Sequence, residues 1–97
     1  GGWSLSANTT GNENVAVGNH ALKENTTASF NTAIGRSALY TNTTGGENVA
    51  IGRHSLYLNT VGEANTAVGM EALAKNVSSS HSTAIGNYSL RENTGSY

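Results

Sequence analysis

The chain is built from a unit of 17 residues that repeats along its whole length without insertion or deletion. When position 1 is placed at Asn14 and its equivalents, position 3 is always Ala, position 5 Gly, position 9 Leu and position 12 Asn. A fixed period of this size predicts a solenoid in which each unit forms one coil, and it argues against one central core. The units span residues 1–13 (partial), 14–30, 31–47, 48–64, 65–81 and 82–97.

The array fills residues 1–97 as a single repeat domain. Gly1 stands at position 5 of its unit, Asn93 at position 12 and the last residue, Tyr97, at position 16. Because the first and last units are incomplete, we expect the chain to be a fragment of a longer array.

The composition argues against several classes of partner. Hydrophobic residues make up 36% of the chain and charged residues 11%, yet the apolar residues keep strict register, which argues against disorder. A net charge of −1 without a basic cluster offers no electrostatic basis for binding nucleic acid or an anionic membrane. Cysteine is absent and no apolar run reaches ~18 residues, so we expect neither thiol chemistry nor membrane insertion in this segment.

Positions 1 to 5 predict a short strand, because β-branched residues at positions 2 and 4 precede the glycine. Side chains at 2 and 4 share one face, and the alanine at 3 takes the other. We expect Val or Ile at position 4 and Leu at position 9 to form two apolar lines in the core. The small alanine then suggests the face that contacts another coil or another chain. The position-4 line contains Val17, Ile34, Ile51, Val68 and Ile85.

Positions 6 to 12 leave two interpretations open. Residues such as 37–41 fit either a single helical turn ended by Asn42 or a second strand with Leu39 pointing inward. The asparagine at position 12 either stacks on its equivalents in a hydrogen-bonded ladder or serves turn geometry alone. Positions 13 to 17 predict a surface loop. The expected fold is therefore all-β, a parallel β-solenoid (β-roll) with one unit per coil and at most a short helical turn in each.

No residue pattern predicts a catalytic, cofactor or metal site. His20 and His54 share position 7 but lie two coils apart, ~10 Å, which is too far for a shared zinc ion. The glutamates vary from unit to unit and lack apolar neighbours, so we expect no glycosidase pair. Tyr40 and Tyr57 occupy position 10 in adjacent coils and can stack. A candidate glycan-contact strip, with ordinary packing as its alternative, contains Trp3, Arg36, Tyr40, Arg53, Tyr57 and Tyr88.

The segment from Asn31 to Gly45, N-T-A-I-G-x-x-A-L-x-x-N-T-T-G, resembles shaft repeats of phage tail-fibre and tail-spike proteins that end in a self-cleaving chaperone domain. Its N-x-A-[IV]-G core is also similar to the head repeats of trimeric autotransporter adhesins, which are left-handed parallel β-rolls packed in threes. The resemblance covers essentially the whole chain, although the 17-residue unit is longer than the usual adhesin head repeat.

The resemblance implies a non-enzymatic, structural or adhesive segment of an extracellular fibre, on a virion or a bacterial surface. Its expected partners are two further copies of itself in a homotrimer, with the position-3 alanines near the contact, and a host-surface glycan or protein receptor. Two alternatives stay open: a self-assembling extracellular filament and a non-catalytic part of a polysaccharide-degrading tail spike. No cofactor is expected.

Overall fold

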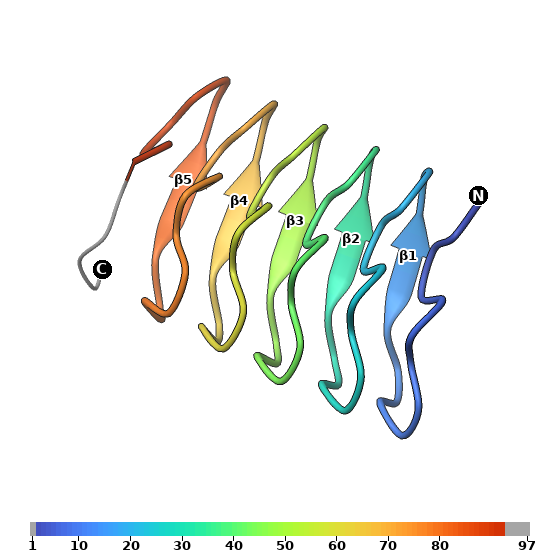
Figure 1. Ribbon diagram of the computed structural model, residues 1–97. Helices are drawn as coiled ribbons and strands as arrows, with labels where there is room; N and C mark the ends of the chain where they lie inside the picture. Colours follow the sequence, from blue (N-terminus) through green and yellow to red (C-terminus); the bar gives the residue numbers. More distant parts are fainter. Residues whose placement is uncertain (1, 93–97) are drawn as a thin grey trace.

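A computed structural model describes residues 2–92 of the chain, so Gly1, Asn93 and Thr94 lie outside the described residues. Five short strands stack side by side in chain order (Figure 1). They are β1 (Val15–Val17), β2 (Thr32–Ile34), β3 (Val49–Ile51), β4 (Thr66–Val68) and β5 (Thr83–Ile85). All neighbours pair in parallel, and each residue pairs with the residue 17 positions later, as Ala33 does with Ala50. The predicted parallel β-solenoid with one unit per coil is confirmed.

The strands turn their alanines into the coil and their larger apolar side chains outward. Ala33, Ala50 and Ala67 are fully buried within this single chain, whereas Ile51 is 36% and Ile85 71% exposed. The position-4 side chains do form a line, but the expectation that this line lies in the core is wrong. The alanines cannot be the contact face with another chain, because their methyl groups are already enclosed.

The physical reason for this orientation is the width of the coil. Leucines at position 9 enter from the opposite wall and are fully buried at Leu22, Leu39, Leu56 and Leu73. With a leucine filling the interior, only a methyl group fits opposite it on the strand. Position 3 therefore admits alanine alone, and the β-branched neighbours at positions 2 and 4 must face away.

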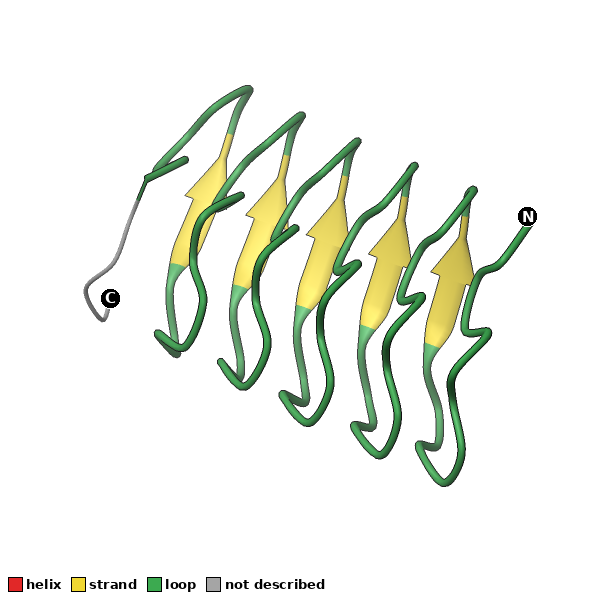
Figure 2. Cartoon of the chain, viewed as in Figure 1, coloured by secondary structure: helices red, strands yellow, loops and turns green. Residues whose placement is uncertain are grey.

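Positions 5 to 12 form consecutive β-turns, and the described residues contain no helix (Figure 2). In one coil the backbone N–H groups of Ser55, Tyr57 and Asn59 donate to carbonyls three residues earlier, each at 3.2 Å. The intervening N–H groups of His54 and Leu56 donate to the neighbouring coils at 3.0 Å. Positive φ values of 60° at His54 and 49° at Leu56 turn alternate peptide groups towards those neighbours. Position 6 to 12 is thus neither helix nor strand.

Two columns of asparagine side chains run through the interior. At position 12 each Nδ2 donates to the Oδ1 of the preceding coil, for example Asn42 to Asn25 at 3.0 Å and Asn59 to Asn42 at 2.9 Å. At position 1 each Oδ1 accepts the backbone N–H of the next coil, as Asn31 does from Asn48 at 2.9 Å. Of the two interpretations left open for position 12, the ladder is confirmed. The same asparagines also serve the turn, because Asn42 Nδ2 donates to the Gly45 carbonyl at 2.8 Å. The position-1 column was not anticipated.

Since the described residues contain no helix, none of them belongs to a helix long and apolar enough to cross a membrane.

Candidate ligand-binding pocket

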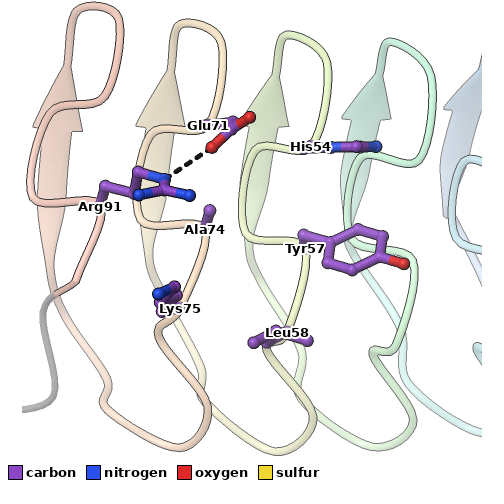
Figure 3. Close-up of a pocket in the computed structure, with 7 residues that line it drawn as sticks. All are labelled: His54, Tyr57, Leu58, Glu71, Ala74, Lys75 and Arg91. Carbon is purple, nitrogen blue, oxygen red and sulfur yellow. Dashed lines mark hydrogen bonds and ion pairs between the residues drawn. The ribbon is translucent and has the colours of Figure 1, made fainter.

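A pocket of about 280 Å³ opens on the turn side of the solenoid, over the coils that carry β3, β4 and β5 (Figure 3). Its lining comes only from positions 7, 10 and 11 of consecutive units, because the β-turns bring these three positions to one face. The lining residues are His54, Tyr57, Leu58, Glu71, Ala74, Lys75 and Arg91.

An ion pair forms one wall of the pocket. The Nε of Arg91 donates to Oε1 of Glu71 at 2.6 Å, and both side chains are partly covered (Figure 3). A charge-assisted bond of this length holds the guanidinium in a defined orientation. The Arg91 guanidinium also lies 5.9 Å from the ring centre of Tyr88. Lys75, at the rim, approaches Glu92 at 3.7 Å on the exposed surface. The wall therefore offers fixed hydrogen-bond donors and acceptors.

Aromatic rings form the opposite wall. The Tyr57 ring centre lies 4.8 Å from that of His54 and 5.4 Å from that of Tyr40, in tilted arrangements. Tyr40 in turn meets His20 edge-on at 5.8 Å and lies under the Lys23 ammonium. These contacts hold Tyr57 at a fixed tilt beside the pocket.

Partial burial lowers the pKa of His54 from its ordinary value, and the charges of Arg53 and Arg36 lower it further while Glu71 opposes them. The imidazole is therefore neutral at neutral pH, with one nitrogen free to accept a hydrogen bond.

The lowered pKa of His54 predicts that this side chain destabilises the fold in mild acid. The unfolded chain binds the proton at its ordinary pKa of 6.5, above the folded value, so stability falls as pH drops from 6.5 through the folded pKa. Urea unfolding of the wild type and of His54→Gln between pH 7.5 and 5 checks this. We expect the wild type to lose more stability than the variant, and equal losses would contradict the assignment to His54.

The residues of the candidate glycan-contact strip do not form one site. Tyr40 and Tyr57 lie together, and Tyr57 lines the pocket. Trp3 is 66% exposed and Tyr88 52% exposed. They lie in coils at opposite ends of the described residues, five units apart, which corresponds to ~24 Å at ~4.8 Å per coil. Arg36 and Arg53 are exposed at position 6 beside His54 and outside the pocket lining.

Most of the pocket was not found from the sequence, which indicated only Tyr57 among its lining residues. A signal for it exists at position 10, which reads Ser6, Lys23, Tyr40, Tyr57, Ala74 and Arg91 along the chain. One small residue stands there between large ones. Comparing units position by position for such a gap would have located the pocket.

Among the described residues, no group of three or more His, Cys, Asp or Glu side chains is arranged to hold a metal ion. Comparison with protein-family models, curated proteins and solved structures gives no significant match to this chain. The functional argument therefore starts from the surfaces of the solenoid itself.

Proposed function

We propose that this chain is a structural and adhesive segment of an extracellular fibre, in which three copies pack together through the outward face of the strand sheet. This outward face consists of positions 2 and 4 of each coil. It carries β-branched side chains in all five strands, among them Val15 (48% exposed), Val17 (54%), Ile34 (38%), Ile51 (36%) and Ile85 (71%). The observation that supports the proposal is the unbroken line of Val and Ile at position 4 of this face, flanked at position 2 by Val or Thr and bearing no charged residue at either position.

The thin interior gives a second reason for lateral association. Each of the four middle coils buries one leucine and a few methyl-sized side chains, and the rest of the interior is asparagine and serine. So small an apolar core contributes little stability for a chain of this size. Covering the outward face with two further copies would add the missing burial, at about 1.5–3 kcal/mol for each fully covered Val or Ile side chain.

The resemblance to phage tail-fibre repeats and to trimeric adhesin heads supports a homotrimer on a virion or a bacterial surface. In that setting the turn side of the solenoid faces outward and presents the binding surface for a host glycan or protein receptor. Contacts that repeat along a rod gain avidity without any strong single site. The segment has no catalytic role in this proposal.

Replacing Ile51 by lysine is expected to weaken assembly at least tenfold without disturbing the coil. The Ile51 side chain points away from the interior of the coil, so the substitution leaves the interior packing unchanged. A three-fold interface, however, would have to bury three added charges. Sedimentation equilibrium over a range of concentrations measures the effect, and circular dichroism reports the fold. Val61→Lys is the matched control, because Val61 is also exposed (49%) but lies outside the strands.

Three other outcomes are informative. A wild-type chain that stays a folded monomer at high micromolar concentration would overturn the proposal. Equal weakening by Ile51→Lys and Val61→Lys would move the contact away from the strand face. Polymers of unlimited length would favour the self-assembling filament over the closed trimer.

A further inference from the structure

The pocket exists because one coil lacks the large side chain that its neighbours carry. At position 10, Tyr40 and Tyr57 fill the turn side of their coils and Arg91 fills the last described one, whereas Ala74 between them ends at its methyl group. Figure 3 shows Ala74 between Arg91, which is bonded to Glu71, and Tyr57. The empty space is therefore about one ring in size and open to solvent.

The spacing of the walls suits a ring. Coils repeat at ~4.8 Å, so Tyr57 and Arg91, two coils apart, are separated by ~9.6 Å along the stack. A ring at the level of Ala74 would lie ~4.8 Å from Tyr57, within the range of face contacts to aromatic rings. Its edge would meet the Arg91 guanidinium, which reaches Glu71 of the Ala74 coil at 2.6 Å. Position 10 already places two rings against each other in this way, because the ring centres of Tyr40 and Tyr57 lie 5.4 Å apart.

The polar groups around the space favour an uncharged, hydroxyl-rich ring over an ion. Glu71 and Arg91 neutralise each other at 2.6 Å, and Lys75 has a partner in Glu92 at 3.7 Å. The carboxylate of Glu71, the guanidinium of Arg91 and the ammonium of Lys75 together supply both acceptors and donors to the lining, as the hydroxyls of a sugar ring require. Leu58, 37% exposed at the rim, offers an apolar contact for ring C–H groups.

We propose that the Ala74 pocket binds one pyranose residue of an uncharged glycan, with the ring against Tyr57 and its hydroxyls bonded to Glu71, Arg91 and Lys75. This inference deepens the adhesive part of the proposed function and rests on it. A single sugar of this size is expected to bind with a Kd on the order of 1 mM, so a fibre gains useful affinity only through several copies of the pocket.

The decisive variant is Ala74→Tyr, which restores at this coil the residue that the two preceding coils carry at the same position. The solenoid accommodates tyrosine there at Tyr40 and Tyr57, so we expect the variant to fold while its ring occupies the pocket. The probes are the methyl glycosides of glucose, galactose, mannose and N-acetylglucosamine, followed by chemical-shift titration. At least one should bind the wild type and lose binding more than tenfold in Ala74→Tyr.

Tyr57→Ala removes the aromatic wall and should also weaken binding. Phe30→Ala is the matched control and should bind as the wild type does, because Phe30 is an exposed aromatic residue (56%) outside the pocket lining. The proposal is overturned if no neutral glycoside shifts the wild-type spectrum at tens of millimolar. It is equally overturned if binding survives Ala74→Tyr, or if only sialic acid or galacturonic acid binds.

Sedimentation of the same samples separates this inference from the fibre proposal. Ala74 lies on the turn side and not on a strand, so Ala74→Tyr should assemble like the wild type. A wild type that forms trimers and binds no sugar refutes the pocket alone. If the wild type is a monomer that binds a glycoside, and Ala74→Tyr abolishes that binding, the trimer is refuted and the pocket is supported.

Discussion

Gly52→Ala is expected to unfold most of the protein, with a loss of more than about 4 kcal/mol in the free energy of unfolding. Gly52 has a φ of 124°, a region that side chains rarely adopt. A methyl group added there would lie 2.6 Å from the carbonyl oxygen of Gly69 and 2.7 Å from its carbon in the next coil. The coils cannot separate to make room, because the Gly69 N–H is bonded to the Ile51 carbonyl at 2.7 Å.

Gly86→Ala separates the backbone cost from the clash. Gly86 has the same φ of 124°, but the nearest described atom to an added methyl group is Ser89 Cβ at 3.9 Å. This variant should lose only the conformational cost of about 1–3 kcal/mol. Urea unfolding followed by circular dichroism compares the two variants. Equal losses would show that contact between adjacent corners does not limit position 5.

Asn42→Ala is expected to cost about 3–5 kcal/mol, because it breaks the buried position-12 ladder in its middle. Asn42 is fully buried, donates to Asn25 at 3.0 Å and accepts from Asn59 at 2.9 Å. The substitution leaves the Asn25 oxygen without its donor and one Asn59 N–H without its acceptor. Each such buried group costs about 1–3 kcal/mol, to which a small cavity adds.

Asn8→Ala tests whether the middle of the ladder matters more than its first described member. Asn8 is only half-buried and accepts a single ladder bond, from Asn25 at 2.9 Å. Its loss should cost about 1 kcal/mol, since water can reach the exposed groups. Thermal unfolding of both variants gives the comparison. If Asn42→Ala were no worse than Asn8→Ala, the ladder would be a consequence of the fold and not a support of it.

Sequence alone predicted the features that depend on the repeat. The 17-residue period specified one coil per unit, and with it the in-register parallel pairing of residues such as Ala33 and Ala50. The line of leucines follows for the same reason. The position-12 ladder was one of two interpretations that the sequence left open, the other being turn geometry alone. Identical side chains stacked at one strand spacing must meet each other, whatever the shape of the coil.

The path of the turns was beyond prediction from the residues. His54 and Leu56 are ordinary side chains with positive φ, a conformation that costs about 1–2 kcal/mol for each residue. Histidine adopts positive φ more often than most side chains do, but nothing in the local preferences of leucine favours it. The conformation persists because it lets alternate peptide groups form hydrogen bonds with the coils on either side. The N–H groups of His54 and Leu56 each donate to a carbonyl of a neighbouring coil at 3.0 Å.

The pocket also depends on residues that only the stacked coils bring together. Arg91 meets Glu71 across 20 positions of sequence, and Ala74 becomes a gap only because Tyr57 and Arg91 stand in the coils beside it. At the variable position 10 the repeat indicated the contact between Tyr40 and Tyr57, but it did not indicate the gap at Ala74.

The repeat therefore determined which residues stack on which, and the tertiary structure decided which face of each strand is inside. Alternation along three residues separates Ala50 from Val49 and Ile51 but does not say which side is enclosed. The closed coil settles this, because Leu56 from the opposite wall leaves room for one methyl group and no more. The larger side chains are exposed for lack of interior volume, although their hydrophobicity alone would have placed them in the core.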